Sequence, residues 1–341
     1  MKNRSLVDTE ASPKKLLVTG MDFLPDEISN HIKSAEIVCT SETSEENLSR
    51  QVKGFVGILF MQSTSHYKIT RKIIESGDKL RFIQSAGVGY DQVDTDAATD
   101  HGVLVTNVAT ATTVSVAEHA VALIMACAKN IVKSDKTIRD GGWQAMDFGV
   151  ELQNKTLGII GFGRIGREVA RRMKAFGMTV LVDSPHVTEN DAKEMGCKKA
   201  DLQTILKESD VITIHTPLTK ETKRLIGEAE FGLMKESAIL VNTARGEVVD
   251  EKALIEALSH GRIKSAGLDV FEHEPIEKDS PLLTLENVVL TPHSAVMNPD
   301  ALTRLLNQNG IQAERALNGI YESVVNPDVL KKLKSGKDGA S

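Results

Sequence analysis

Residues 157–166 are Leu-Gly-Ile-Ile-Gly-Phe-Gly-Arg-Ile-Gly, and this stretch decides the fold. An apolar run leads into Gly161, Gly163 and Gly166, which have the G-x-G-x-x-G spacing, and a helical pattern of apolar residues follows. In a βαβ unit the first glycine permits a tight turn, the second lets a pyrophosphate approach the backbone, and the third lets the helix pack on its strand. The N–H groups at the helix start, at Arg164 and Ile165, then face the phosphates. The stretch therefore predicts a dinucleotide-binding Rossmann unit.

Asp183 is the acidic residue that this fingerprint requires. It ends a second apolar run, residues 179–182, and it stands roughly 20 residues after the first glycine. A carboxylate at this place accepts hydrogen bonds from both ribose hydroxyls of an adenosine and repels a 2′-phosphate. Ser184 and Pro185 follow it, without an arginine that would neutralise such a phosphate. We therefore predict NAD rather than NADP as the cofactor.

Composition narrows the class of protein. The chain has 341 residues, with 47 acidic and 41 basic side chains and a net charge of −6, which argues against nucleic acid or an anionic membrane as the main partner. Cys39, Cys127 and Cys197 form no C-x-x-C pair, which is typical of a reducing compartment. The polar segment 1–15 is no secretory signal, and no apolar run is long enough to span a bilayer. We expect a cytoplasmic protein without a metal site.

The N-terminal part of the chain alternates between strand-like and helix-like segments. Its predicted strands are residues 15–20, 35–40, 55–61, 80–86 and 103–107. Helical patterns lie between them, for example over 70–76. Alternation of this kind predicts a parallel sheet that is covered by helices on both faces.

The segment 113–128 that follows is apolar on nearly every side, which predicts a buried helix. After it come the dinucleotide unit and four further predicted strands, at residues 211–215, 238–242, 265–269 and 288–291. With the two strands of the dinucleotide unit, they predict a doubly wound sheet of at least six strands. The last helical pattern covers residues 300–318.

Because the dinucleotide unit starts in the middle of the chain, the N-terminal sheet must form a separate domain. We expect the last helix to return to it, so that the chain crosses a hinge near Val108 and again near Val296. The predicted fold class is α/β with two doubly wound parallel-sheet domains. A Rossmann NAD domain, residues 108–296, is inserted into a flavodoxin-like substrate domain formed by residues 1–107 and 297–341.

Three polar residues follow predicted strands of the second sheet: Arg245, Glu274 and His293. Ligands of open α/β sheets bind beyond the carboxyl ends of the strands, so these side chains can converge on one cleft. Arginine binds a carboxylate through two hydrogen bonds, histidine can donate a proton to a developing alkoxide, and a neighbouring glutamate stabilises the imidazolium. Beside a nicotinamide, this set would reduce a 2-oxo acid to a 2-hydroxy acid. Taken singly, each residue also has a structural explanation, such as an arginine that caps a strand-end carbonyl.

Together these segments resemble the D-isomer-specific 2-hydroxyacid dehydrogenase family, from about Ser85 to about His293. The motifs that carry the resemblance are Ala-Gly-Val-Gly-Tyr-Asp at 86–91, Ser-Val-Ala-Glu-His at 115–119, the glycine fingerprint, His-Thr-Pro-Leu at 215–218, Asn-Thr-Ala-Arg-Gly at 242–246, Leu-Asp-Val-Phe at 268–271 with Glu-Pro at 274–275, and Thr-Pro-His at 291–293. The family implies two α/β domains, usually as a homodimer with the helix after Thr113 at the dimer interface.

The resemblance also implies roles for single residues. Arg245 would bind the substrate, His293 would be the acid/base, and Glu274 would be coupled to it. Backbone amides near Val88 and Gly89 would hold the substrate carboxylate. The predicted cofactor contacts are Gly161, Gly163, Arg164, Ile165, Gly166, Asp183, His215, Thr216, Pro217, Thr243, Ala244 and, for the nicotinamide carboxamide, Asp269.

His119 and His273 are tempting histidines for which we expect no catalytic role. His119 lies on the predicted buried helix, whereas an acid/base histidine needs a cleft. His273 lies in a loop, where we expect it to face solvent.

The residues expected around the far end of the substrate differ from those in some members of the family. Phosphoglycerate dehydrogenases carry arginines for the substrate phosphate where this chain has Gln62 and Ser85. That disfavours phosphoglycerate but leaves it as an alternative, beside glyoxylate, hydroxypyruvate and larger apolar 2-oxo acids. Formate dehydrogenases carry glutamine at the place of Glu274, so the glutamate favours the hydroxyacid reaction. An NAD(H)-sensing protein of the corepressor type is the alternative from another functional class. The chain ends soon after its last predicted helix, so we expect no C-terminal regulatory domain.

Overall fold

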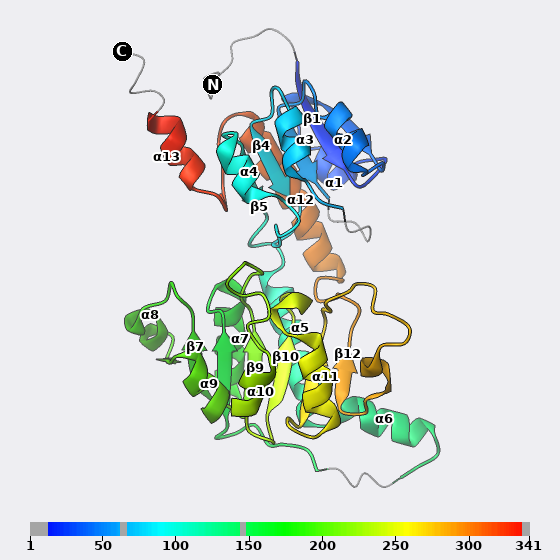
Figure 1. Ribbon diagram of the computed structural model, residues 1–341, viewed down its shortest axis with the longest axis vertical. Coiled ribbons are helices and arrows are strands. Elements are labelled where there is room, and N and C mark those ends of the chain that lie inside the picture. The colour runs from blue at the N-terminus through cyan, green and yellow to red at the C-terminus, as the bar shows by residue number, and fades with distance from the viewer. Residues whose placement is uncertain (1–12, 62–66, 144–147, 336–341) are drawn as a thin grey trace. The chain divides into compact units, whose positions relative to one another are not determined.

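The chain divides into two compact units in the computed structural model, which describes residues 13–61, 67–143 and 148–335 (Figure 1). Unit 1 comprises Met1–Thr112 and Asn298–Ser341, and unit 2 comprises Thr113–Met297. Unit 1 is thus formed by two separate stretches of chain.

The first boundary lies after residue 112, five residues later than the sequence suggested. Local contacts explain this difference, because the segment after residue 107 is bound to the rest of unit 1. The N–H of Val108 donates to the carbonyl of Gly87 over 3.0 Å, and Nε of Arg304 donates to the carbonyl of Ala111 over 3.2 Å. The second boundary, between residues 297 and 298, is one residue later than suggested.

Unit 1 is built on a parallel sheet of five strands in the order β2-β1-β3-β4-β5. Its strands are β1 (Lys14–Thr19), β2 (Ala35–Thr40), β3 (Gly57–Phe60), β4 (Phe82–Ser85) and β5 (Leu104–Asn107). Its helices are α1 (Asp26–Ser29), α2 (Glu45–Gln51), α3 (Arg71–Ser76), α4 (Thr95–Asp100), α12 (Pro299–Leu317) and α13 (Asp328–Ser335). This strand order is that of the flavodoxin-like fold, as the sequence predicted. Apolar clusters lie on both faces of the sheet, and α12 contributes to one of them.

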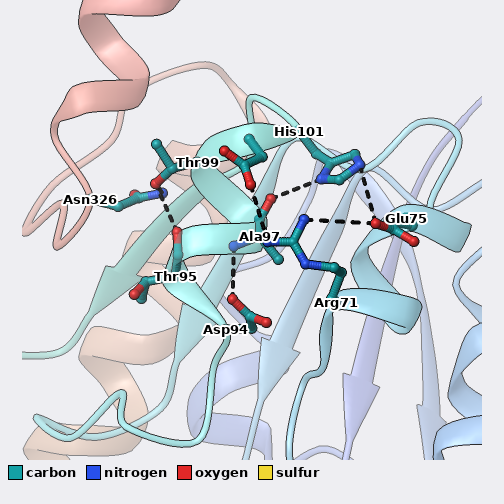
Figure 2. Close-up of polar contacts among 9 residues, drawn as sticks. Arg71, Glu75, Asp94, Thr95, Ala97, Thr99, His101 and Asn326 are labelled. Atoms are coloured by element: carbon teal, nitrogen blue, oxygen red, sulfur yellow. Dashed lines mark hydrogen bonds and ion pairs between the residues drawn. The ribbon is translucent and has the colours of Figure 1, made fainter. Parts of the chain in front are cut away.

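Polar contacts fasten the returning C-terminal segment to unit 1 (Figure 2). Asn326 accepts a hydrogen bond from the N–H of Val105 in β5 over 2.8 Å, and its Nδ2 donates to Oγ1 of Thr99 in α4 over 3.2 Å. The C-terminal segment therefore completes the edge of this sheet beside β5.

Figure 2 also shows an ion pair within α3. Arg71 pairs with Glu75 one turn later, with 3.8 Å between the charged atoms.

Unit 2 is built on a parallel sheet of seven strands in the order β12-β11-β10-β9-β6-β7-β8. Its strands are β6 (Thr156–Ile160), β7 (Thr179–Asp183), β8 (Lys198–Lys199), β9 (Val211–Ile214), β10 (Ile239–Asn242), β11 (Ser265–Leu268) and β12 (Val288–Leu290). The order reverses between β6 and β9, which is the switch point of a doubly wound Rossmann sheet. The predicted fold class is confirmed for both units.

Helices cover both faces of this sheet (Figure 1). The helices of unit 2 are α5 (Thr113–Ala128), α6 (Ile131–Arg139), α7 (Arg164–Ala175), α8 (Glu189–Glu194), α9 (Leu202–Glu208), α10 (Glu228–Leu233) and α11 (Glu251–Ser259), with short 3₁₀ turns η1 (Gly246–Val248) and η2 (Pro281–Thr284). One apolar cluster joins the sheet to α5 and α7, and the other joins it to α9, α10 and α11. The buried parallel strands explain the continuous apolar runs in the sequence.

The apolar helix α5 is largely buried, as the sequence suggested. A Cβ at Gly267 of β11 would lie only 3.0 Å from Cβ of Leu123, so this glycine lets α5 lie close against the sheet. One stripe of α5 stays exposed: Val114, Glu118 and Ala122. Among the described residues no single helix has the length and apolarity of a bilayer span, and α5 reaches that composition only together with α6, across a bend of 60°.

Candidate active site

The glycine turn joins β6 to α7 in the predicted way. Gly161 has a φ of +95°, a conformation that favours glycine. A Cβ at this position would lie 2.5 Å from the carbonyl carbon of His215 and from the backbone nitrogen of Thr216, and a Cβ at Gly166 would lie 2.3 Å from the carbonyl oxygen of Gly161. The first and third glycines are thus required by close backbone contacts.

Gly163 differs, because nothing lies within 4 Å of the place where its Cβ would be. It precedes Arg164, the first residue of the twelve-residue helix α7, and no side chain caps this helix start. Open space therefore adjoins the N–H groups of Arg164 and Ile165. A pyrophosphate fits this arrangement, since a helix start offers free N–H groups and a positive dipole end to an anion.

Asp183 ends β7, beside this turn, and its carbonyl accepts a hydrogen bond from the N–H of Gly161 over 2.8 Å. Its side chain is half-buried. Burial is the main cause that raises the pKa of Asp183 above its usual range, the nearby Asp201 raises it further, and Lys199 opposes both. The carboxylate forms no hydrogen bond or ion pair within the described parts of the chain, so it can accept from ribose hydroxyls.

The segment His215, Thr216 and Pro217 follows β9 and lies against the glycine turn. Nε2 of His215 is 2.9 Å from Oγ1 of Thr213, whereas Nδ1 is buried without a hydrogen-bond partner among the described residues. Burial lowers the pKa of His215, which favours a neutral imidazole. Its unpaired nitrogen leaves one polar atom for a ligand bound at this turn.

The turn after β10 carries Arg245 and is held by Asn242. Nδ2 of Asn242 donates to the carbonyl of Arg245 over 2.9 Å, and its Oδ1 accepts the N–H of Ala244 over 3.0 Å. The hydroxyl of Thr243 is buried and has no hydrogen-bond partner in the described residues. The sequence assigned no role to Asn242, although it lies in the Asn-Thr-Ala-Arg-Gly motif.

Glu274 and His293 are in direct contact, and the charge of Arg245 acts on Glu274. A Cβ at Gly246 would lie 1.9 Å from the carbonyl carbon of Phe271, so glycine is needed for the Arg245 turn to pack on the loop that carries Glu274. The N–H of Phe271 donates to Oε1 of Glu274 over 3.1 Å, and Oε2 of Glu274 lies 2.7 Å from Nδ1 of His293. Because Nδ1 is occupied by this contact, Nε2 is the nitrogen that can reach a substrate.

The surroundings of Glu274 favour its ionised form. Burial would raise the pKa of Glu274, but the hydrogen bond and charge of His293, the N–H of Phe271 and the charge of Arg245 together lower it. The side chain of His293 is 47% exposed, against 20% for Glu274. The glutamate is therefore an ionised partner that lies behind an accessible imidazole.

Asp269, predicted to contact the nicotinamide, is buried and engaged by the loop that carries His293. Its carboxylate accepts the hydroxyl of Thr291 over 2.6 Å and the N–H groups of Ser294 and Ala295 over 2.8 and 3.1 Å. Its own carbonyl accepts the N–H of His293 over 2.8 Å. In this structure Asp269 thus shapes the loop after β12.

His119 reaches the same cluster, which the sequence did not reveal. Its Nε2 lies 2.9 Å from Oγ1 of Thr291 and 3.3 Å from Oδ1 of Asp269. From α5, His119 therefore supports the loop that carries His293, in keeping with the structural role expected for it. His273 is exposed, also as expected. No local pattern could have linked His119 to residues so far away in the chain.

Val88 and Gly89, the predicted substrate-binding amides, lie in the half-buried loop after β4 in unit 1. All other predicted site residues belong to unit 2. Ser85 is buried at the end of β4, and its hydroxyl donates to the carbonyl of Gly89 over 2.6 Å. Gln62 lies outside the described residues. Within the described ranges, no group of three or more His, Cys, Asp or Glu residues could hold a metal ion.

Comparison with known proteins agrees with this geometry. Residues 121–295 match the family model of the NAD-binding domain of D-isomer specific 2-hydroxyacid dehydrogenases. The chain is 44% identical over 284 residues to D-3-phosphoglycerate dehydrogenase from Archaeoglobus fulgidus, covering 83% of this chain and 53% of that protein. It is 40% identical to glyoxylate reductase from Pyrococcus furiosus, over 93% of this chain and 95% of that enzyme.

Among solved structures, D-lactate dehydrogenase from Aquifex aeolicus, complexed with NAD and lactic acid, matches with a TM-score of 0.77 and 31% identity, over 93% of this chain and 98% of that one. The chain spans about half the length of the phosphoglycerate dehydrogenase that it matches. It nevertheless covers nearly all of the glyoxylate reductase. These matches show that the chain belongs to the D-isomer specific 2-hydroxyacid dehydrogenase family.

Proposed function

We propose that the protein is an NAD-dependent D-2-hydroxyacid dehydrogenase, which reduces a 2-oxo acid to a D-2-hydroxy acid and catalyses the reverse reaction. The observation that carries this proposal is the 2.7 Å contact between Nδ1 of His293 and Oε2 of Glu274, with Arg245 as a charged neighbour. A proton donor, its anionic partner and a carboxylate-binding cation are the groups that such a reaction requires.

The residues would divide the chemistry as follows. Arg245, with the backbone amides of Val88 and Gly89, holds the substrate carboxylate. A bound NADH supplies the hydride to the carbonyl carbon. Nε2 of His293 donates the proton that the carbonyl oxygen needs, and Glu274 stabilises the imidazolium before this transfer. In the reverse direction His293 accepts the hydroxyl proton.

The cofactor would be bound by unit 2, with its pyrophosphate at Gly163 and its adenosine ribose at Asp183. Gly161 and Gly166 permit the turn, Arg164 and Ile165 offer N–H groups, and the remaining contacts come from His215, Thr216, Pro217, Thr243, Ala244 and Asp269. Asp183 supports NAD over NADP, because its carboxylate would repel a 2′-phosphate.

A small 2-oxo acid such as glyoxylate or hydroxypyruvate is the substrate class that we favour. At Ser85 the chain has a hydroxyl that already donates to the carbonyl of Gly89, so this place supplies no cation for a phosphate. Charge-assisted hydrogen bonds contribute about 1.5–3 kcal/mol each. Phosphoglycerate dehydrogenase activity stays the second candidate, because the Archaeoglobus fulgidus enzyme of that name is 44% identical.

A substrate panel tests the function directly. NADH oxidation would be followed with glyoxylate, hydroxypyruvate, pyruvate, a branched 2-oxo acid and 3-phosphohydroxypyruvate. We expect turnover of the small acids and weak turnover of the phosphate. Preference for the phosphate would select the second candidate. Tight NADH binding without turnover of any acid would overturn the enzymatic proposal and favour an NAD(H)-sensing protein of the corepressor type.

We also propose that the protein is a cytoplasmic homodimer that associates through α5 and α6. Helix α6 has no buried residue, and its side chains Ile131, Val132 and Ile138 are 53%, 50% and 52% exposed. Exposed apolar patches of this kind are typical of protein interfaces. Free Cys39, Cys127 and Cys197 support a reducing compartment, which cell fractionation would check.

Sedimentation tests the dimer. Ile138→Asp should shift the protein toward monomers, because a charge would be buried at the interface. Leu302→Asp is the matched control, since Leu302 is similarly exposed, at 47%, but lies on α12 in unit 1. A monomeric unmodified chain, or equal effects of both substitutions, would contradict this interface.

A further inference from the structure

The loop of residues 86–89 in unit 1 is held by hydrogen bonds to its carbonyl oxygens. Three of these oxygens, on Ala86, Val88 and Gly89, accept from buried side chains. In that order, the donors are Nδ2 of Asn309 at 2.8 Å, Nδ2 of Asn107 at 2.6 Å and Oγ of Ser85 at 2.6 Å. The fourth oxygen, on Gly87, accepts the N–H of Val108 at 3.0 Å. Every carbonyl of the loop is therefore fixed by unit 1.

Fixing the carbonyls also orients the N–H groups of the loop. In a trans peptide the C=O of one residue and the N–H of the next point in opposite directions. The bonds to Ala86, Gly87 and Val88 oxygens thus turn the N–H groups of Gly87, Val88 and Gly89 away from those donors. The N–H groups of Gly87 and Val88 donate to no acceptor in the described parts of the chain. Two successive N–H groups are thereby left for an anion, and clusters of backbone N–H groups are recurrent anion-binding elements.

The donors themselves are firmly placed. Ser85 and Asn309 are fully buried, and Asn107 is only 6% exposed. Nε2 of Gln84 donates to Oδ1 of Asn309 over 3.0 Å, so the amide nitrogen of Asn309 is the atom that is left for Ala86. Hydrogen bonds in such a dry environment are strong, and a buried carbonyl that loses its donor is costly.

We propose that Asn107, Ser85 and Asn309 are positioning residues for substrate binding. None of them needs to touch the substrate. By holding the carbonyls of the 86–89 loop, they keep its amides pointed at the substrate carboxylate. This inference rests on the proposed function, which assigns that carboxylate to the amides of Val88 and Gly89.

Binding of oxamate, a stable 2-oxo acid analogue, to the complex with NADH tests the inference by calorimetry. Asn107→Asp keeps the side-chain shape but removes the N–H donor, and it should weaken oxamate binding about tenfold or more. The KM for the 2-oxo acid should rise by a similar factor, whereas kcat and NADH affinity should change little. A general loss of structure would instead lower NADH affinity and kcat as well.

A pair of substitutions at Ser85 separates the hydroxyl from the space that it occupies. Ser85→Thr and Ser85→Val add side chains of nearly equal shape, but only threonine keeps a donor for Gly89. Oxamate affinity should fall about tenfold more in the valine variant than in the threonine variant. Asn309→Ala should also weaken oxamate binding about tenfold. Asn307→Ala is its matched control and should leave oxamate affinity unchanged, because Asn307 lies on the same helix but contacts Thr303 and His31 instead.

The outcomes are distinct. Oxamate affinity within twofold of the unmodified chain in both Asn107→Asp and Ser85→Val would overturn the positioning role, and so would equal losses in Ser85→Thr and Ser85→Val. If the unmodified chain with NADH neither binds oxamate nor reduces any 2-oxo acid, the proposed function fails, and this inference fails with it.

Discussion

Glu274 and His293 stand 19 residues apart in the chain, yet a hydrogen bond of 2.7 Å joins Oε2 of the first to Nδ1 of the second. The bond fixes which imidazole nitrogen remains for chemistry. It also places an ionised carboxylate behind an imidazole that is nearly half exposed. The roles proposed for the two residues can be tested by substituting each side chain separately.

His293→Ala should lower kcat for 2-oxo acid reduction by about 10²–10⁴, the usual contribution of a general acid. NADH affinity should stay unchanged, because the glycine turn is untouched. His273→Ala is the control, since this exposed histidine lies next to Glu274 in the chain. Steady-state kinetics would show the difference, and near-normal turnover of the His293 variant would remove it from the acid role.

Glu274→Gln should move the alkaline limb of the pH profile for reduction to lower pH. The contact with His293 lowers the pKa of Glu274, and the resulting carboxylate charge favours the protonated form of the pair, which glutamine cannot do. The profile of kcat/KM between about pH 5 and 9 measures this shift. Glu277→Gln, at an exposed position nearby, serves as the control. Superimposable profiles for Glu274→Gln and the unmodified chain would show that the two groups are not coupled.

Gly163→Ala should weaken NADH binding by about tenfold or more while leaving the melting temperature unchanged. The added methyl group meets no protein atom within 4 Å, so the fold tolerates it, but it occupies the space assigned to the pyrophosphate. Gly232→Ala also adds a methyl group in open space, within α10, and should leave NADH affinity unchanged. Fluorescence titration with NADH checks the prediction; unchanged affinity would place the phosphates elsewhere.

Asp183→Ser should reduce the preference for NADH over NADPH by about tenfold or more, because the charge that repels a 2′-phosphate is removed and hydrogen bonds to the ribose weaken. Parallel titrations with the two cofactors measure the ratio of dissociation constants. Lys198→Ser, at an exposed position of β8, controls for a change of local charge. Equal or tighter binding of NADPH to the unmodified chain would reject the assignment to NAD.

Asp269→Asn should destabilise unit 2 by about 1–3 kcal/mol at neutral pH, because an amide offers the N–H groups of Ser294 and Ala295 a weaker set of acceptors. Burial would raise the pKa of Asp269, but hydrogen bonds from His119, Thr291 and Ser294 lower it. A lowered pKa means that the carboxylate contributes its full stability above its unfolded value of about 3.9 and loses it as pH falls through the folded value.

The difference between Asp269→Asn and the unmodified chain should therefore shrink in acid, below about pH 4. Urea unfolding at a series of pH values measures it, with Asp279→Asn as an exposed control. A difference that is constant across this range would mean that ionisation of Asp269 contributes nothing to stability.

Strands and turns with a local sequence pattern could be predicted from the sequence alone. Buried parallel strands such as β6 and β9 are continuous apolar runs, and the turn after β6 must have glycine where backbone segments touch. Both sheets could therefore be predicted. Strand β8 was missed, because Lys198 and Lys199 are exposed and pair with β7 through their backbone only. Helix α6 was missed as well, since it buries no side chain.

The site could be predicted from the sequence only in part, again because only local patterns can be recognised there. Arg245, Glu274 and His293 each follow a strand, so their convergence on one sheet edge could be predicted. The contacts that orient the site residues join distant parts of the chain. Asn309 lies 223 residues after Ala86, and His119 lies 172 residues before Thr291. Hydrogen bonds over such separations follow from the folded packing and leave no pattern in the sequence.

Because Asn309 lies in α12, its hydrogen bond to the carbonyl of Ala86 affects the order in which a nascent chain folds. Translation delivers the 86–89 loop early, then all of unit 2, and only afterwards the helix that fixes the loop. During synthesis, unit 2 can acquire its glycine turn before the loop gains its last fixed carbonyl. The ribosome must release α12 before all four carbonyls of the 86–89 loop can be held.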